Sequence, residues 1–214
     1  MTLSNTLSDY MADLPLLAIL RGIQNHECVA IAEALVESGF RCIEVPLNSP
    51  NAIESIRMLA QRFSSDYLIG AGTVLTVKQV EDVQQAGGRL IVMPHADSKI
   101  IRAAKQTQMI CTPGVATLTE AFSALENGAD GLKLFPAESV APTVLKAWRT
   151  VLPATTICLP VGGVKPDGMA TYLTAGANGF GLGSNLYKAG DSLTQVRQNA
   201  EAYVQAWRQL KAAA

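Results

Sequence analysis

Short apolar runs alternate along the chain with longer stretches in which apolar and polar residues recur at helical spacing. The runs have the length and composition of strands. Their alternation with helix-like stretches is typical of repeated strand–helix units built around a parallel sheet. Eight runs are predicted to be strands, over residues 16–21, 42–47, 68–73, 90–94, 109–114, 131–136, 157–162 and 179–183.

The stretches between these runs carry helix signals. In residues 25–38, Val29, Ala32 and Leu35 recur on one helical face, and Gly39 follows as a stop signal. A glycine just after a helical stretch and just before the next strand is typical of a helix-to-strand loop with a glycine cap. The same ending recurs at 84–88, 126–130 and 174–178.

The number of units indicates the architecture. Eight units share the roughly 195 residues that follow position 20, or about 24 residues each, which is near the minimum for a strand, a helix and two short loops. We therefore predict an α/β fold, a single (β/α)8 TIM barrel domain over residues 1–214, with a short N-terminal helix over 1–13 that closes the barrel bottom. The alternative, an open doubly wound sheet, does not usually need eight such even units.

Composition and charge exclude several classes of protein. The 214 residues include 17 Lys and Arg against 18 Asp and Glu, a net charge of −1, so nothing favours nucleic acid or an acidic membrane as a partner. With 49% hydrophobic and 16% charged residues, extended disorder is excluded. The N-terminus lacks the features of a secretory signal, and no apolar run approaches the roughly 20 residues of a membrane span. We predict a cytoplasmic protein.

The cysteines and histidines do not suggest a metal site. The four cysteines lie far apart and none falls in a CxxC or CxxH pair, which indicates free thiols. They are Cys28, Cys42, Cys111 and Cys158. No HExxH or similar spacing occurs, so we expect neither a metal nor a cofactor.

Two charged residues interrupt the apolar strands. Alternation in 42–47 sends Ile43 and Val45 to one face and Glu44 to the other, so Glu44 is predicted to point into the barrel. The same alternation in 131–136 predicts that Lys133 and Phe135 point inward. Burying either charge alone would cost several kcal/mol. The pair is therefore either an internal ion pair or a reactive pair, in which a lysine of lowered pKa attacks a carbonyl and the carboxylate moves protons.

The ends of the last two strands carry glycines suited to phosphate. Gly162 and Gly163 end the seventh strand, and Gly183 and Ser184 end the eighth. Loops after strands 7 and 8 are the usual phosphate seat of such barrels, because bare backbone N–H groups can approach the oxygens. We predict that these four residues bind a phosphate.

Further polar groups follow the first and third strands. Arg21 lies where it could hold a carboxylate or a phosphate, and Thr73 offers a hydroxyl. Val161 precedes the glycine pair. Arg21 and Thr73 are therefore predicted contacts to the rest of a bound molecule, and Phe135 is predicted to lie on the inward face with Lys133.

Seven blocks, in order, resemble one family over essentially the whole chain after residue 13. The blocks are LAILRGI (17–23), EVPLNSP (44–50), GAGTVL (70–75), TPGVAT (112–117), LKLFPA (132–137), PVGGV (160–164) and GLGSNLY (181–187). They resemble the class I 2-keto-3-deoxy-6-phosphogluconate and 2-dehydro-3-deoxy-6-phosphogalactonate aldolases. The resemblance implies that Lys133 forms a Schiff base with pyruvate, that Glu44 is the general acid and base, and that Thr73 contacts the pyruvyl carboxylate end. It also implies a homotrimer.

Three positions bear on which phosphorylated 2-keto-3-deoxy sugar acid is the substrate. The gluconate-type enzymes typically have an arginine shortly after the glutamate and a threonine before the glycine pair. This chain has Asn48 and Val161 at those two positions. It has an arginine at position 21 instead, Arg21. The combination resembles the galactonate type, which implies cleavage of 2-dehydro-3-deoxy-6-phosphogalactonate to pyruvate and glyceraldehyde 3-phosphate. Cleavage of the gluconate epimer is the alternative. A phosphosugar isomerase or epimerase, which would use Glu44 without an imine, and a non-catalytic barrel that binds a phosphorylated metabolite are further alternatives.

Overall fold

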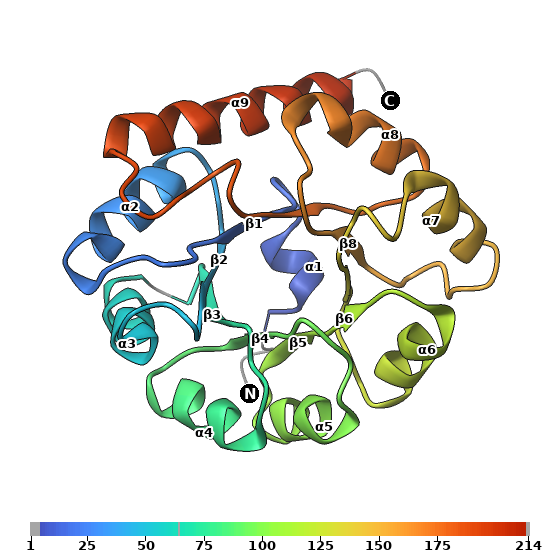
Figure 1. The fold of residues 1–214 in the computed structure, drawn as a ribbon, viewed down its shortest axis with the longest axis horizontal. Helices are drawn as coiled ribbons and strands as arrows, with labels where there is room; N and C mark the ends of the chain where they lie inside the picture. Colours follow the sequence, from blue (N-terminus) through green and yellow to red (C-terminus); the bar gives the residue numbers. More distant parts are fainter. Residues whose placement is uncertain (1–4, 64, 213–214) are drawn as a thin grey trace.

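The computed structural model describes residues 5–63 and 65–212, which form a closed α/β barrel of parallel strands surrounded by helices (Figure 1). The strands are β1 Leu16–Ile19, β2 Cys42–Pro46, β3 Leu68–Gly72, β4 Leu90–Val92, β5 Ile110–Thr112, β6 Gly114–Val115, β7 Leu132–Leu134, β8 Cys158–Pro160 and β9 Phe180–Leu182. The helices are α1 Leu7–Tyr10, α2 Asn25–Glu37, α3 Ala52–Arg62, α4 Val77–Gln85, α5 Ser98–Gln106, α6 Leu118–Glu126, α7 Pro142–Trp148, the 3-10 turn η1 Pro166–Gly168, α8 Met169–Thr174 and α9 Leu193–Ala212. The predicted TIM barrel is confirmed.

Strand pairing closes the barrel. One sheet has the order β5-β4-β3-β2-β1-β9 and the other the order β6-β7-β8, with every pair parallel. A bridge between Val161 and Gly181 joins the end of the second sheet to the first. Because all strands run the same way, their carboxyl ends meet at one end of the barrel.

The predicted fifth strand, 109–114, was wrong in one respect, since it consists of two short strands. Pro113 separates β5 from β6 because it has no N–H to donate to a ladder. Its carbonyl still accepts a hydrogen bond from Lys133 N at 2.9 Å, which keeps β7 in register. The other strands begin at, or one residue after, their predicted starts, and each is shorter than predicted because residues at its ends belong to the loops.

The predicted N-terminal helix over 1–13 is also shorter in the structure. Residues 1–4 lie outside the described part of the chain, and α1 is a single turn that a capping box between Thr6 and Asp9 begins. Pro15 disfavours helix at Leu14. The chain makes a tight turn there, in which Leu16 N donates to Leu14 O at 2.8 Å, and β1 then begins.

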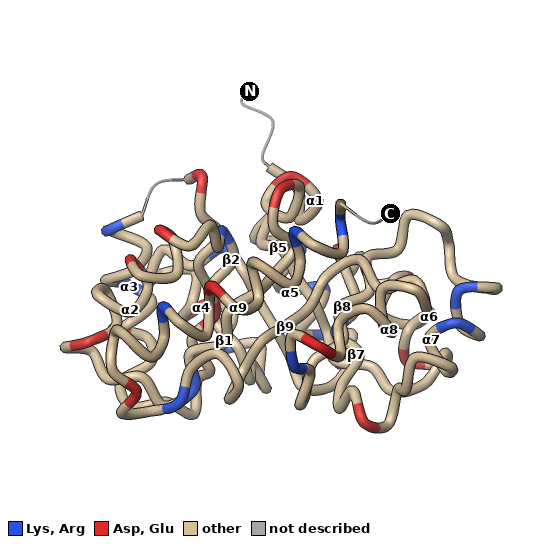
Figure 2. Tube along the Cα trace, turned by 90° about the horizontal axis from the view of Figure 1, so that it is seen from above, with Lys and Arg blue, Asp and Glu red and all other residues tan. Residues whose placement is uncertain are grey.

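Helix α1 covers the amino-terminal end of the barrel. It lies in the middle of the ring of strands in Figure 1 and at one end of the barrel in Figure 2. Its buried side chains, with that of the following residue, pack on inward-facing strand residues. This cluster consists of Leu7, Tyr10, Met11, Leu17, Cys42, Leu68, Leu90, Val92, Ile110 and Leu159. The end of the barrel opposite the strands' carboxyl ends is therefore filled with apolar side chains.

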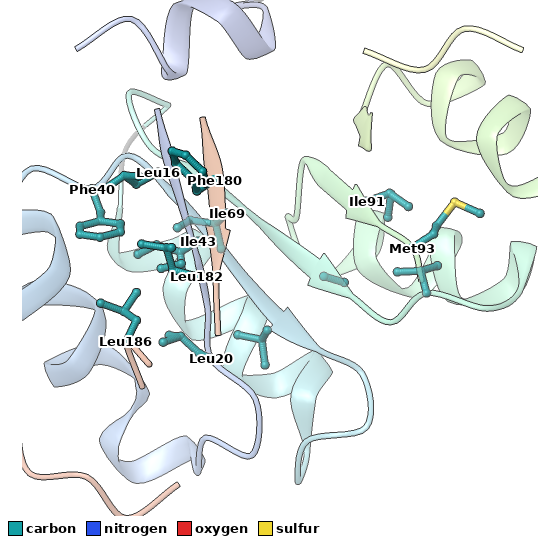
Figure 3. Packing of buried hydrophobic residues seen from close by; sticks show 14 of the residues in the cluster. Leu16, Leu20, Phe40, Ile43, Ile69, Ile91, Met93, Phe180, Leu182 and Leu186 are labelled. Carbon is teal, nitrogen blue, oxygen red and sulfur yellow. The ribbon is translucent and has the colours of Figure 1, made fainter. Parts of the chain in front are cut away.

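A second, larger apolar layer lies between the strands and the surrounding helices. Ile43 and Val45 of β2 and Leu132 and Leu134 of β7 belong to it, so the outward faces of these strands are the ones that their alternation predicted. Figure 3 shows part of this layer around Ile43 and Ile69. No helix in the described residues is long and apolar enough to cross a membrane.

The first prediction concerns the apolar end of the barrel. Leu7 is 2% exposed within the interior cluster, so Leu7→Ala should lower the free energy of unfolding by about 2–5 kcal/mol through lost burial and a residual cavity. Denaturant unfolding measures this change. Ser8→Ala, an exposed change on the same turn, should be close to neutral. Equal stabilities of the two variants would show that α1 does not contribute to the core.

Candidate active site

Two ionisable side chains lie inside the barrel. Glu44 on β2 is 1% exposed and Lys133 on β7 is 5% exposed. They interact electrostatically, because the charge of each opposes the effect of burial on the pKa of the other. The ion pairs formed by residues 5–63 and 65–212 do not include one between them. Among these residues, Glu44 and Lys133 therefore interact through their charges without a direct ion pair.

Gly72 at the end of β3 provides the space for the Glu44 carboxyl group. A Cβ on Gly72 would lie 1.3 Å from Glu44 Oε2, a distance at which no side chain fits. In the described structure, Oε2 is buried and has no hydrogen-bond partner. A buried carboxyl oxygen without a partner strongly favours the neutral form of the group.

Burial shifts the pKa of each group in the direction that favours its neutral form. Loss of hydration raises the pKa of Glu44 to about 7, against the opposing charges of Lys133 and Arg21. Burial lowers the pKa of Lys133, against the charge of Glu44, and Arg21 lowers it further. Lys133 Nζ also lies 4.6 Å from the centroid of the Phe135 ring. A carboxyl that exchanges protons near pH 7 thus lies beside an amine whose neutral form is favoured.

Arg21 connects the carboxyl ends of the first three strands. Its Nη1 donates to Asn48 Oδ1 at 2.6 Å, and its Nη2 donates to Thr73 Oγ1 at 3.4 Å. Thr73 has a φ of 54°, a conformation that is costly for a β-branched residue and that clusters at functional sites. The arrangement gathers a cation, an amide and a hydroxyl at one edge of the barrel mouth.

A cavity of about 520 Å³ opens at this end of the barrel. Eight of the ten residues that the sequence analysis selected line it: Arg21, Lys133, Phe135, Val161, Gly162, Gly163, Gly183 and Ser184. Glu44 and Thr73 do not line the cavity. Each of them interacts with a residue that lines it. Glu44 interacts with the charge of Lys133, and Thr73 accepts a hydrogen bond from Arg21.

The glycine loops present free backbone donors to this cavity. Among the described residues, the N–H groups of Gly162, Gly163, Gly183 and Ser184 make no hydrogen bond. Gly162 and Gly163 have φ values of 121° and 62°, which other residues rarely adopt. Backbone N–H groups without partners in glycine loops around one cavity can bind a phosphate or another anion.

Val161 directly precedes the glycine pair and lines the cavity. It is 5% exposed, and its side chain fills the space that a Cβ on Gly181 would need, since that Cβ would lie 2.6 Å from Val161 Cγ2. The part of the cavity wall that Val161 forms is therefore apolar. Val161 offers no hydrogen bond to a bound molecule.

Two features of the site were absent from the sequence analysis. The sequence analysis treats Gly72 only as part of a strand. Gly70 and Gly72 both face inward next to a strand with an inward glutamate, and this pattern is a signal that a glycine leaves space for the glutamate side chain. Lys188 lines the cavity too, and its place four residues after Ser184 gave no signal of this. Loop residues follow no period from which their direction could be read.

Comparison with known proteins identifies relatives over nearly the whole chain. The family model for KDPG and KHG aldolase matches residues 7–200. The chain is 44% identical to the 2-dehydro-3-deoxy-6-phosphogalactonate aldolase of Escherichia coli K12, over 94% of this chain and 98% of that protein.

Solved structures agree with the sequence comparison. A structure described as native KDPGal has a TM-score of 0.91 and 45% identity, and covers 93% of this chain and 97% of its own. The KDPG aldolase of Legionella pneumophila, captured with pyruvate as a covalent carbinolamine intermediate, has a TM-score of 0.81 and 27% identity, with 96% and 98% covered.

The second prediction concerns the charge interaction inside the barrel. The ¹³C shift of the Glu44 carboxyl should titrate with a midpoint near 7. Lys133→Met removes a positive charge that favours the carboxylate, so the midpoint should move to higher pH. NMR titration of labelled glutamate measures both values.

Glu120 serves as the internal control for this titration. Hydrogen bonds from the backbone, of which the one from Ala116 N is the strongest, lower the pKa of Glu120, so it should titrate below the usual range of a glutamate in both proteins. A Glu44 midpoint that falls, or stays the same, when Lys133 is replaced would contradict the interaction.

Proposed function

The chain belongs to the KDPG and KHG aldolase family, and we propose that it cleaves 2-dehydro-3-deoxy-6-phosphogalactonate to pyruvate and glyceraldehyde 3-phosphate. As a member of this family it is a class I aldolase, a carbon–carbon lyase. One observation carries the assignment of the site: a buried lysine of lowered pKa, which interacts with the charge of a buried carboxyl group, lines a cavity together with glycines whose backbone N–H groups are free. The family assignment does not support the isomerase and the non-catalytic alternatives.

Lys133 is the proposed nucleophile. Its neutral Nζ attacks the C2 ketone of the substrate, and loss of water gives a protonated imine. The imine accepts the electron pair of the C3–C4 bond when that bond breaks. Burial and the charge of Arg21 both favour the neutral amine that this first step requires.

Glu44 is the proposed general base and acid. The carboxylate form removes the proton of the C4 hydroxyl, the C3–C4 bond breaks, and glyceraldehyde 3-phosphate leaves. The enamine on Lys133 then takes a proton at C3 from Glu44, and hydrolysis of the imine releases pyruvate. A pKa near 7 allows the same group to accept and to return the proton at neutral pH.

The remaining residues are assigned by their places around the reacting lysine. Arg21 and Thr73, joined by a hydrogen bond, are proposed to hold the carboxylate end of the substrate, and Phe135 covers the amine. Gly162, Gly163, Gly183 and Ser184 are proposed to bind the phosphate through their free N–H groups. The proposed steps need no cofactor.

The apolar wall of the cavity bears on the choice of epimer. The two candidate sugar acids differ at C4, the carbon next to the bond that breaks. Val161 presents only methyl groups to the cavity, so it cannot hydrogen-bond a hydroxyl in either configuration. We therefore retain the gluconate epimer as the second candidate substrate, and place the galactonate epimer first because relatives with 44% and 46% identity bear that name.

Three further features remain predictions from the sequence. They are a homotrimer, a cytoplasmic location, and a single domain over residues 1–214. The described residues contain no group of three or more histidines, cysteines or acids that could hold a metal ion.

A third prediction tests the position of the Glu44 carboxyl group. In Gly72→Ala the new Cβ would occupy the place of Oε2, so the carboxyl must move. A displacement of about 1 Å in a reacting group can cost about 100-fold in rate, so kcat should fall by about that factor or more. Because the atom displaced is the end of a flexible side chain, the protein should still fold.

Gly168→Ala is the matched control. Gly168 has a φ of −83°, and a Cβ there would meet nothing within 4 Å. Steady-state cleavage, with thermal unfolding of each variant, distinguishes a displaced carboxyl from a damaged fold. Normal turnover of folded Gly72→Ala would show that the position of Glu44 is not critical.

A fourth prediction tests the epimer. Wild-type protein should cleave the phosphogalactonate substrate with the higher kcat/KM. Val161→Thr keeps the shape of the side chain and replaces a methyl group by a hydroxyl. The ratio of kcat/KM for phosphogluconate to kcat/KM for phosphogalactonate should therefore rise by about 10-fold, which corresponds to one hydrogen bond worth about 1.4 kcal/mol. A wild-type preference for phosphogluconate would reverse the assignment of substrate.

A further inference from the structure

A third basic residue lines the cavity besides Arg21 and Lys133. Lys188 lines the cavity together with Gly183, Ser184 and Ala189. It lies in the segment between β9 and α9, and it does not belong to any ion pair formed by the described residues. Its ammonium group is therefore available to a bound molecule.

The segment that carries Lys188 is fixed on both sides. Tyr187 is 1% exposed, and its hydroxyl donates to Glu27 Oε1 at 2.9 Å. The backbone N–H of Lys188 donates to Asp191 Oδ2 at 2.8 Å. The backbone of Lys188 is thus held at the cavity, while the long side chain keeps its freedom.

Lys188 lies at the part of the cavity that the second glycine loop forms. The N–H groups of Leu186 and Tyr187 both donate to the carbonyl oxygen of Gly183, at 2.8 and 3.0 Å, so the chain turns back on Gly183 just before Lys188. Lys188 therefore lines the cavity together with Gly183 and Ser184, whose N–H groups have no partner among the described residues.

A phosphate at that end needs a positive charge. A phosphate monoester carries a charge of about −1.5 to −2 near neutral pH. The N–H groups carry only partial charges, and a carboxylate lies close by: the Cβ positions of Gly162 and Gly163 would be 3.0 and 2.9 Å from the oxygens of Glu138. Glu138 disfavours an anion at the glycine pair. Of the three basic residues that line the cavity, Arg21 donates to Asn48 and Thr73, and Lys133 is the proposed nucleophile, which leaves Lys188 for the phosphate.

We propose that Lys188 is a substrate-binding residue that pairs with the phosphate group of the aldehyde fragment. The inference rests on the proposed function. It adds a charged contact to a proposed phosphate site that otherwise consists of backbone N–H groups and the hydroxyl of Ser184. Because the phosphate is remote from the bonds that change, the contact stabilises ground state and transition state alike, and its loss raises KM with little change in kcat.

The test compares two aldehydes in the condensation with pyruvate. Lys188→Gln should raise the KM for glyceraldehyde 3-phosphate by about 10-fold or more. This factor corresponds to the loss of a charge-assisted contact worth at least about 1.4 kcal/mol. The KM for unphosphorylated glyceraldehyde should stay within about 2-fold of the wild-type value, because that aldehyde offers Lys188 no anion. Lys188→Arg, which keeps the charge, should restore most of the affinity for the phosphorylated aldehyde.

Lys165→Gln is the matched control. Lys165 is exposed and directly follows the first glycine loop, and it does not line the cavity. The control should leave both KM values unchanged. An equal rise for both aldehydes in Lys188→Gln, or an equal effect of Lys165→Gln, would overturn the specific role of Lys188.

A binding measurement separates this inference from the proposed function. The dissociation constant of inorganic phosphate, measured by calorimetry, should be about 10-fold higher for Lys188→Gln than for wild type, whether or not the protein condenses aldehydes. Failure of the wild type to catalyse condensation would refute the proposed function alone. Identical phosphate binding by the two proteins would refute the role of Lys188 alone.

Discussion

The burial of Glu44 and Lys133 in the barrel interior is the constraint on which the rest of the site depends. Two opposite charges inside an apolar barrel would normally be neutralised or joined in a direct ion pair. Here they interact, and the ion pairs of the described residues do not join them, so each retains part of its desolvation penalty. That penalty favours a proton-exchanging carboxyl and a neutral amine, which are the two forms that imine chemistry requires.

Several features far apart in the sequence maintain this condition. Gly72 supplies the space for the carboxyl group, and Phe135 lies beside the amine. Helix α1 and the inward apolar residues fill the other end of the barrel, so Lys133 is reached from the carboxyl ends of the strands. The same cavity then extends to the free N–H groups of the two glycine loops. A substrate with a ketone at one end and a phosphate at the other matches this order.

Strand alternation and barrel geometry make much of this site predictable from the sequence alone. Inward or outward direction follows from a period of two, and this period places Glu44 and Lys133 inside the barrel. The break at Pro113 and the single turn of α1 do not follow from it, because they depend on one missing N–H and on where a short helix stops. The space at Gly72 depends on the rotamer of a side chain from another strand. The contact of Lys188 with the cavity depends on the path of a loop, which has no period.

The measurement that tests the central claim most directly is trapping of the imine. The protein is treated with pyruvate and sodium borohydride, its intact mass is measured, and peptide mapping locates any reduced adduct. The account predicts one carboxyethyl adduct per chain, on Lys133. An unmodified protein that is shown to be folded, or an adduct on another lysine with Lys133 free, would contradict it.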